Sequence, residues 1–553
     1  MHYQLLAETL EAVSQSRGKL AKIDLLAQTL HRLEGEELVV SARLLSGSPF
    51  AEWEETVTSA GWATVARAAA VVTGWDLETL GASAAAIGDL GEAIALLLPE
   101  TPGLPEMTIG ETDLLFRRLA TLRKAAEKQA LLEQVLRRST PVEAKYFLKT
   151  LSGGLRIGAD VTTIEEAVAQ AFEAGREAVA RARRDSGDIG ETARAAREGR
   201  LSEIRFRLFH PIGFMLASPI EDAEEVASEL PLLAVEDKFD GIRAHAHKEE
   251  GRVELFSRTL DSVTEQFPEI AASLATLPGS FLVDGEIVAW RTAPSEAGSA
   301  KEGPDSFFKL QRRLGRKAPA PELLSEIPAA FIGYDCLFHD GQALFEAPWE
   351  DRRRHLEELG RAELRVSEVF SAATPGELED RFAAARDRGN EGLVLKRRDS
   401  LYQAGKRGRA WRKWKKATAT LDVVVTAVQQ GNGKRAGMLS DYTFAVRNGE
   451  EFVTIGKAYS GLTDEEIRTL GARFRKITLA RYGPVRAVSP EIVLEVAFDT
   501  IQKSNRHKSG FALRFPRIAR LRPDKSPADA NTLDDVRELY VRLTGDRPAP
   551  PSP

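Results

Sequence analysis

The sequence is poor in cysteine, and it has neither a long apolar run nor a leader-like N-terminus. The single cysteine, Cys336, excludes an intrachain disulfide and any zinc site built from several cysteines, and it fits a reducing compartment. Because Cys336 lies in the apolar run 331–338, we expect it to fill the core. No apolar stretch approaches the roughly 18 residues of a membrane span, and residues 1–17 lack a basic segment followed by an apolar one. We therefore expect a cytoplasmic protein with no membrane segment.

The chain carries a small negative net charge, and its cations are unevenly distributed. The formal net charge is -6 over 553 residues, which excludes a uniformly basic nucleic-acid binder. Residues 396–416, however, contain ten Lys or Arg against one acid, and residues 503–525 contain eight against one. Aromatic residues lie inside both segments, so solvated helix faces explain them less well. We expect two positive surfaces that face polyanions.

The hydrophobic pattern changes along the chain, and the length favours two to four domains. In residues 1–205, apolar residues recur at helical spacing among polar ones, as from Ile164 to Arg184. This spacing predicts an all-α bundle. Residues 206–416 mix short apolar strands with helical stretches, which is typical of an α+β domain. The fold class we expect is therefore multidomain α+β.

The C-terminal part of the sequence is rich in strand signals. The β-branched run Leu421 to Val428 predicts a strand, and Asn448-Gly449 between two further apolar runs predicts a tight hairpin. Short strands over residues 417–545 predict a small β-barrel such as an OB-fold. The Pro-rich end, residues 546–553, is predicted to be a disordered tail.

The segment Lys238-Phe239-Asp240-Gly241-Ile242-Arg243 fits a lysine that attacks a nucleotide. That chemistry needs an amine that can accept an activated phosphoryl group, a cation that holds phosphate, and a glycine that lets the backbone approach the nucleotide. Because a charged lysine is a poor nucleophile, we expect desolvation and neighbouring positive charge to favour the neutral amine. Taken alone, the segment is equally compatible with a charged turn after a strand.

Later segments carry other groups that adenylyl transfer would need. Arg258 offers a second cation near the end of a strand. Glu286 ends an apolar strand with a carboxylate suited to Mg²⁺, and Glu391 supplies a second carboxylate beside a glycine. Tyr334 offers a ring for stacking on a purine. Each of these residues has a structural alternative, such as a solvated strand end or a place in the core.

The first basic segment adds cations that could hold a triphosphate. Arg409, Lys413 and Lys415 lie within it, and in a strand Lys413 and Lys415 would point to the same face. The structural alternative is a basic surface stripe.

The order and content of these segments resemble the covalent nucleotidyltransferase superfamily, and most closely the ATP-dependent DNA ligases. The resemblance extends from near Leu5 to Lys525, and it implies that Lys238 is the adenylated nucleophile, with ATP and Mg²⁺ (or Mn²⁺) as cofactors. The family usually has phenylalanine at the stacking position, where Tyr334 keeps the ring. The implied contacts are Glu236 with adenine through its backbone, Arg243 and Arg258 with ribose and phosphate, Glu286 with ribose or metal, Tyr334 with adenine, Glu391 with metal, and Arg409, Lys413 and Lys415 with the triphosphate.

Two flanking segments extend the resemblance. The segment Gly510 to Arg517 and the residues after it resemble the family's final motif, which implies that Arg514, Arg517, Asp524 and Lys525 orient the ATP pyrophosphate. The segment Thr140 to Gly158 resembles part of the family's DNA-binding domain. Its glycines would let backbone amides approach DNA phosphates; the structural alternative is a helix–loop junction.

The resemblance implies a monomeric ATP-dependent DNA ligase that acts on nicked double-stranded DNA. An NAD-dependent DNA ligase would use the same lysine, but its four-cysteine zinc finger is excluded by the cysteine count. An RNA ligase, a capping enzyme or another nucleotidyltransferase remains an alternative, although those enzymes do not normally carry such a long helical domain before the nucleophile. A non-enzymatic DNA-binding protein would have no use for Lys238, Glu286 and Glu391 together.

Overall fold

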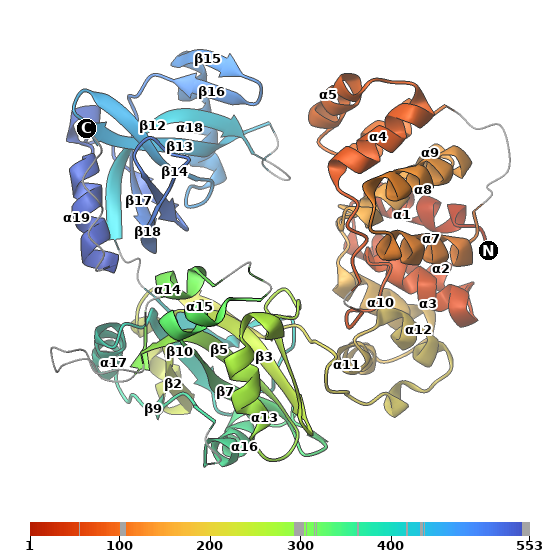
Figure 1. The fold of residues 1–553 in the computed structure, drawn as a ribbon, viewed down its shortest axis with the longest axis horizontal. Helices are drawn as coiled ribbons and strands as arrows, with labels where there is room; N and C mark the ends of the chain where they lie inside the picture. The colour runs from red at the N-terminus through yellow and green to blue at the C-terminus, as the bar shows by residue number, and fades with distance from the viewer. Residues whose placement is uncertain are drawn as a thin grey trace.

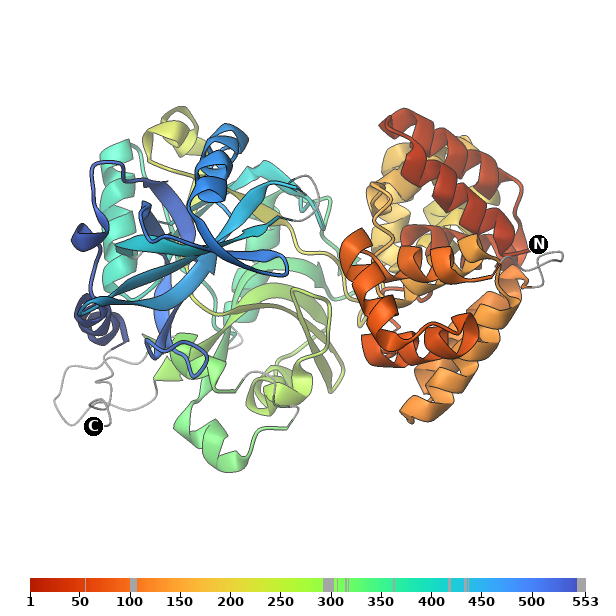
Figure 2. The ribbon, with the colours of Figure 1, turned by 90° about the horizontal axis from the view of Figure 1, so that it is seen from above.

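The computed structural model describes residues 1–54, 56–99, 107–291, 303–305, 307–313, 316, 318–361, 364–415, 419–431, 435 and 437–544. An all-helical N-terminal domain, a central domain of two sheets and a strand-rich C-terminal domain follow one another along the chain (Figure 1). The C-terminal domain lies over the central domain, and the helical domain lies to one side (Figure 2). This is the predicted fold class. The predicted tail and the predicted boundary at 416/417 lie outside the described residues, and none of the described helices is long and apolar enough to cross a membrane.

The N-terminal domain is built from amphipathic helices around one apolar core. Its buried side chains run from Tyr3 to Leu201, so both ends of the domain contribute to the same core. Helices start where the sequence offers caps: the Thr108 and Thr140 hydroxyls each accept a bond from an amide in the first turn, within a capping box. The helices are α1 (Gln4–Gln15), α2 (Lys19–His31), α3 (Gly35–Ser46), α4 (Trp62–Thr73), α5 (Leu77–Ile87), α6 (Leu90–Leu97), α7 (Ile109–Thr121), α8 (Ala125–Arg138), α9 (Pro141–Leu151), α10 (Val161–Ala171), α11 (Arg176–Ser186) and α12 (Ile189–Arg197).

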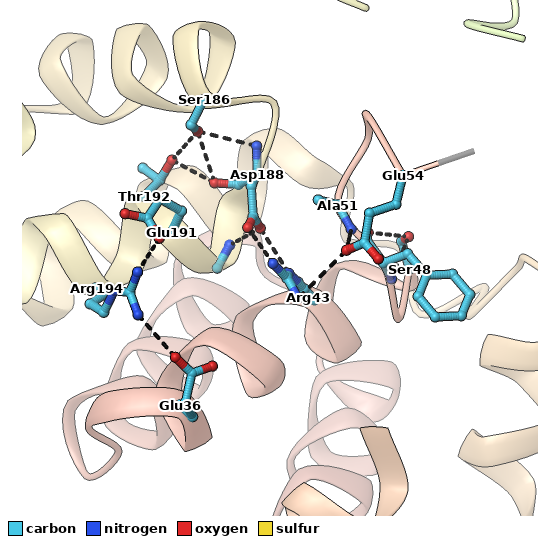
Figure 3. Close-up of polar contacts among 12 residues, drawn as sticks. Glu36, Arg43, Ser48, Ala51, Glu54, Ser186, Asp188, Glu191, Thr192 and Arg194 are labelled. Atoms are coloured by element: carbon cyan, nitrogen blue, oxygen red, sulfur yellow. Dashed lines mark hydrogen bonds and ion pairs between the residues drawn. The ribbon is translucent and has the colours of Figure 1, made fainter. Parts of the chain in front are cut away.

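A buried ion pair joins the beginning of the helical domain to its end (Figure 3). The Arg43 guanidinium on α3 donates through Nε and Nη2 to the Asp188 carboxylate, at 2.9 and 2.5 Å. Asp188 also caps α12 by accepting from the Gly190 amide at 2.8 Å. The two helices are close enough that a Cβ on Gly190 would lie 2.5 Å from the Val39 carbonyl oxygen. The ion pair and the close contact at Gly190 therefore hold α3 and α12 together, although the two helices are far apart in the sequence.

The helical run from Ile164 to Arg184 forms parts of two helices. α10 ends at Ala171, and Glu173 takes a left-handed conformation with φ of 51° before α11 begins at Arg176. The Ala174 amide donates to the Ala169 carbonyl, which closes the end of α10. Periodicity alone did not reveal this break, because apolar residues continue on both sides of it.

The central domain consists of two sheets and the helices packed on them. One sheet has the strand order β1-β11-β10-β2-β9 and the other has β4-β3-β5-β7-β8, with β6 paired to β5. The strands are β1 (Leu216–Ile220), β2 (Leu233–Lys238), β3 (Ile242–Glu249), β4 (Arg252–Ser257), β5 (Phe281–Arg291), β6 (Gly303–Pro304), β7 (Ala329–His339), β8 (Gln342–Ala343), β9 (Val369–Phe370), β10 (Gly392–Arg397) and β11 (Arg407–Trp414). The helices are α13 (Pro268–Ala275), α14 (Phe307–Gln311), α15 (Pro321–Glu326), α16 (Trp349–Arg361) and α17 (Pro375–Asp387).

The chain passes from one sheet to the other within the segment predicted to be reactive. β2 ends at Lys238 in the first sheet, and β3 begins at Ile242 in the second. Antiparallel pairing places Gly392 of β10 beside Lys238, and Glu286 of β5 beside Arg243. The turn 239–241 therefore brings the acidic residues of two sheets to the same lysine. Cys336 is fully buried in β7, as expected of core filler.

The C-terminal domain is the predicted strand-rich unit. The predicted hairpin is present: Asn448 ends β13, Gly449 has φ of 63°, and β14 begins at Glu451. The β-branched run lies in β12, which pairs with β13, β16 and β17 and contributes to an apolar core. The elements are β12 (Ala419–Gln430), β13 (Leu439–Asn448), β14 (Glu451–Ala458), α18 (Asp464–Lys476), β15 (Thr478–Tyr482), β16 (Val485–Val488), β17 (Val493–Phe498), β18 (Thr500–Lys503), β19 (Phe511–Arg514), β20 (Arg517–Leu521) and α19 (Leu533–Thr544).

Candidate active site

A cavity of about 890 Å³ lies between the two central sheets and the C-terminal domain. Most of the residues predicted to act on the nucleotide line it, although they come from distant parts of the sequence. Those that line it are Glu236, Lys238, Arg243, Arg258, Glu286, Tyr334, Glu391, Lys413, Lys415, Arg514 and Arg517. The cavity therefore gathers the candidate nucleophile, both candidate metal ligands and cations from two domains.

Lys238 meets a carboxylate at the end of β2. Its Nζ lies 2.5 Å from Glu391 Oε2, and both side chains are about three-quarters buried. Burial alone would lower the pKa of Lys238, but the carboxylates of Glu391 and Glu286 outweigh burial and raise that pKa above its ordinary value. The expectation of a neutral amine is therefore wrong for the chain by itself. A reacting amine needs these carboxylates to be engaged elsewhere.

The carboxylates around Lys238 form a site that suits a hard cation. The Glu286 side chain has no hydrogen bond or ion pair among the described residues, and burial raises its pKa to about 8. Burial and the nearby Glu391 also raise the pKa of Asp240 to about 6. Crowded, poorly compensated carboxylates of this kind are stabilised by a divalent cation with oxygen ligands. Glu286 and Glu391, the two predicted metal ligands, thus fit such an ion.

The Arg243 guanidinium is held in place by hydrogen bonds to a buried carboxylate and a backbone carbonyl. It donates to both oxygens of Asp284, at 3.0 and 2.6 Å, and to the Met215 carbonyl at 2.6 Å. Asp284 is fully buried and also accepts from the Tyr402 hydroxyl at 2.7 Å. Burial opposes ionisation of Asp284, but the Arg243 charge overrides it and holds the pKa of that carboxyl far below its usual range. Arg243 also lies 5.6 Å from the Tyr334 ring centroid, so the predicted cation and the predicted stacking ring are adjacent.

A second buried ion pair supports the same ring. Lys396 Nζ lies 2.7 Å from Glu236 Oε2, and both side chains are almost fully buried. The Lys396 ammonium also donates to the Tyr334 carbonyl at 2.8 Å and lies 4.6 Å from the centroid of its ring. Burial lowers the pKa of Lys396 and raises that of Glu236. The Glu236 side chain is thus occupied inside the domain, which leaves its backbone as the part that can meet a base.

Cations gather at the opposite end of the carboxylate cluster. Burial and the charges of Lys238, Arg407, Lys415 and Arg258 lower the pKa of Lys413. Lys415 Nζ lies 2.8 Å from Asp499 Oδ2 of the C-terminal domain and 3.9 Å from Glu391. Burial also lowers the pKa of Arg514 on β19. Such a concentration of positive charge suits a polyphosphate.

Gly241 is required by the packing of the turn on β5, and it also lines the cavity, where its approach to a nucleotide stays a prediction. A Cβ at this position would lie 2.3 Å from the Ile287 carbonyl oxygen and 2.8 Å from Glu286 Cγ on β5. The glycine therefore lets the turn between the sheets pack against β5. The close approach is to protein backbone, which sequence reasoning could not see.

Three predicted residues lie outside the cavity. Arg409 lines a separate hollow of about 460 Å³. Lys525 Nζ lies 2.6 Å from Asp422 Oδ2 within the C-terminal domain, and Asp524 accepts from Arg522 at 2.7 Å. In this arrangement of the domains, Arg514 and Arg517 are the predicted pyrophosphate-orienting residues that line the cavity.

Gly153 and Gly154, which follow α9, have free space where a side chain would be, but their amides already donate hydrogen bonds to the helix. The Gly153 amide donates to Thr150 and the Gly154 amide to Lys149, so both close the end of the helix. A Cβ at either glycine would meet no atom within 4 Å. A DNA strand could approach this turn, yet it would not find these two amides free.

Sequence reasoning gave no role to several residues that shape the site. Lys396 stands out in the sequence as the lysine at the end of the strand after Glu391, but its buried partner Glu236 does not. Asp284 could have been noticed as an acid in the middle of an apolar strand, because a charge in such a position needs a partner. Asp499 offered no signal, since its contact with Lys415 depends on how two domains meet.

Comparison with known proteins finds the same family in all three domains. The family model described as "ATP dependent DNA ligase domain" matches residues 214–415, "DNA ligase N terminus" matches 2–169, and "ATP dependent DNA ligase C terminal region" matches 435–525. The "Probable DNA ligase" of Koribacter versatilis is 42% identical, over 97% of this chain and 96% of that protein. The "DNA ligase" of Methanopyrus kandleri is 34% identical, over 98% of this chain and 99% of that protein.

The overall fold also has a solved counterpart. The structure named "Pmar-Lig_PreS3" has a TM-score of 0.60 at 15% identity, covering 94% of this chain and 99% of that one, and it supports the three-part architecture. The family models cover all three domains, and the relatives match nearly end to end. On these grounds the chain belongs to the family of ATP-dependent DNA ligases.

Proposed function

We propose that the chain seals nicks in duplex DNA through a covalent lysyl-AMP intermediate. The observation that carries this proposal is the placement of Lys238 in a cavity lined by both candidate metal ligands and by cations of two domains. The catalytic nucleophile is the Lys238 amine. Nick sealing is a step shared by replication, repair and recombination of DNA.

The first step forms a bond between Lys238 Nζ and the α-phosphorus of ATP and releases pyrophosphate. The amine must lose its proton before it attacks, and this loss becomes easier when Glu391, whose Oε2 lies 2.5 Å from the amine, is engaged by a cation. Lys413, Lys415 and Arg514 offset the negative charge that builds on the phosphates. Tyr334 holds the adenine by stacking, on a ring supported by Lys396 and Arg243.

Two further displacements complete the reaction. An oxygen of the 5′-phosphate at the nick attacks the α-phosphorus, and the bond to Lys238 breaks. The 3′-hydroxyl then attacks the 5′-phosphorus, AMP leaves, and the strand is joined. Because Asp499 and Arg514 of the C-terminal domain occupy one wall of the cavity, that domain must move away before a nick can reach the adenylate.

Glu286 and Glu391 would hold Mg²⁺, or Mn²⁺, when the nucleotide is bound. Such an ion neutralises negative charge on phosphate oxygens. Engaging these carboxylates also removes the charges that raise the pKa of Lys238, which favours the neutral amine.

Surfaces outside the cavity would hold the duplex, and the protein would work as a monomer in the cytoplasm. In the hollow that contains Arg409, Arg397 pairs with Asp399 and Arg412 pairs with Glu229. Arg409 has no ion pair among the described residues, so we infer that it meets the DNA backbone. This role replaces the triphosphate contact implied by the sequence. Binding through such contacts weakens steeply with salt.

The test is incubation with ATP labelled at the α-phosphate and Mg²⁺, then a denaturing gel and a chase with nicked duplex DNA. We expect a label on the protein that disappears as a sealed strand appears. Lys238→Ala should abolish the label and retain DNA binding, whereas Lys406→Met, at an exposed lysine outside the cavity, should keep the label. A label that only nicked RNA discharges would assign the chain to RNA ligases, and a label on Lys238→Ala would remove the proposed nucleophile.

A further inference from the structure

Two histidines and a glutamate converge on the central domain outside the nucleotide cavity. His339 is the last residue of β7, and His355 and Glu358 lie on the same face of α16, which packs against β7. One ligand atom from each residue lies within 4.8 Å of the other two. Among the described residues, no other group of three or more His, Cys, Asp or Glu side chains meets this condition.

The spacing of these atoms suits a small transition-metal ion. The two Nδ1 atoms lie 3.1 Å apart, and Glu358 Oε2 lies 3.8 Å from His339 Nδ1. Two ligands at zinc distances of about 2.0–2.1 Å in a tetrahedral arrangement are about 3.3 Å apart. The imidazole rings are nearly perpendicular, at 83°, with centroids 5.3 Å apart. The larger of the two departures from this spacing belongs to Glu358, whose side chain is exposed and can turn toward the ion.

A further carboxylate stands behind one of the rings. Asp340 Oδ2 lies 3.9 Å from His339 Nε2, the nitrogen that faces away from the cluster. The other Asp340 oxygen accepts from the Ser280 amide at 2.8 Å, which fixes the carboxyl group. A carboxylate that accepts a hydrogen bond from a ligating histidine sets its tautomer and strengthens its donation to a metal. The Asp340 carboxylate lies on the side where it could give such support, once the separation of 3.9 Å closes by about 1 Å.

We propose that His339, His355 and Glu358 form a zinc site, with water completing the coordination. Two imidazoles and a carboxylate select a borderline metal such as Zn²⁺ over the hard Mg²⁺, which prefers oxygen ligands alone. The ion would tie the end of β7 to α16. Those two elements already share the fully buried pair Arg352–Asp335, at 2.7 Å, and β7 also carries Tyr334 of the nucleotide cavity. The site is independent of the proposed ligation chemistry.

The experiment is calorimetric titration of the tag-free, full-length chain with Zn²⁺ in the presence of saturating Mg²⁺. Mg²⁺ occupies the oxygen ligands of the nucleotide cavity, so it separates the two kinds of site. We expect one Zn²⁺ per chain and a melting temperature that rises with Zn²⁺. His355→Ala and Glu358→Gln should each weaken binding at least tenfold and abolish the shift in melting temperature. Co²⁺ bound in place of Zn²⁺ should show the visible absorption of a tetrahedral nitrogen–oxygen site.

Matched controls keep the result interpretable. Glu357→Gln changes the neighbouring glutamate on α16, and His507→Ala removes a half-exposed histidine of the C-terminal domain, so neither should alter Zn²⁺ affinity. Glu358 is exposed, so its variant should fold even if loss of His355 disturbs the domain. Equal Zn²⁺ affinity in the wild type and both cluster variants would overturn the proposal. So would the absence of saturable binding, which would leave only a hydrogen bond between two imidazoles.

Discussion

Replacement of Lys396 by methionine tests how the site is held together. Methionine keeps most of the apolar stem and removes the ammonium that lies 2.7 Å from Glu236 Oε2. The remaining cation near Glu236 is Arg353, whose Nη1 lies 3.8 Å from the other carboxylate oxygen. Removing one partner of a buried pair costs about 3–5 kcal/mol, because the other charge stays buried. We expect a loss near the lower end of that range, since Arg353 compensates in part.

The pH dependence of this loss has a defined sign. Burial already raises the pKa of Glu236, and removal of Lys396 raises it further. A carboxyl group whose pKa is raised on folding favours the folded state at low pH and opposes it as the pH rises through the folded value. The deficit of Lys396→Met should therefore shrink as the pH falls from 8 toward 5.

Hydrogen exchange followed by mass spectrometry provides the assay, because a chain of several domains does not unfold in one step. Peptides from β2 and β10 report the opening free energy of the affected sheet. Lys406→Met, at an exposed position, should change it by less than about 0.5 kcal/mol. The double variant with Glu236→Gln should lose less than Lys396→Met alone. A loss below about 1 kcal/mol, or additivity of the two changes, would refute the argument.

Further predictions follow from single contacts. Gly241→Ala should destabilise the central domain by about 1–3 kcal/mol, seen as faster hydrogen exchange in β3 and β5, because its Cβ would overlap a β5 carbonyl; unchanged exchange would contradict this. Arg43→Ala should cost the helical domain about 3 kcal/mol, seen as faster exchange in α3 and α12, because the buried Asp188 carboxylate loses its positively charged partner. Glu286, whose pKa is raised from 4.5 to about 8, increasingly opposes folding as the pH rises from 4.5 to about 8, so Glu286→Gln should flatten the fall in melting temperature over that range. Arg514→Ala should slow adenylation at least tenfold and spare sealing of pre-adenylated nicks, whereas Lys525→Ala, which removes a lysine outside the cavity, should spare both rates. Equal losses in the two rates for Arg514→Ala would exclude its role with pyrophosphate.

The sequence predicted the parts of the structure that local chemistry determines. Asn448-Gly449 forms its hairpin because both residues tolerate the backbone angles of the turn. The segment around Lys238 and the carboxylates Glu286 and Glu391 meet in one cavity, as the order of the motifs implied. What could not be predicted depends on contacts between distant elements. The role of Gly241 follows from its distance to β5, and the pKa of Lys238 follows from carboxylates on two other strands.

The same limit explains why some residues with an implied nucleotide role lie outside the cavity in this arrangement of the domains. Arg409 was assigned to the triphosphate from its position in a basic segment, but it faces a different hollow from Lys413. Lys525 was assigned to the pyrophosphate, but it is engaged by Asp422 inside its own domain. A count of charges along a chain locates a basic surface, whereas the direction of each side chain depends on strand twist and on domain contacts.

The ion pair between Arg43 and Asp188 has a consequence for how the chain folds during synthesis. The helical domain uses its last helices to complete a core begun by its first, and α10 packs on α2 as α12 packs on α3. During synthesis, the first helices leave the ribosome long before their partners exist, with apolar faces still exposed to water. Chaperones would meet them in that interval. The core of the domain can be completed only when the residues up to about Leu201 have emerged from the ribosome. Its folding therefore has to wait until the end of the domain has been translated.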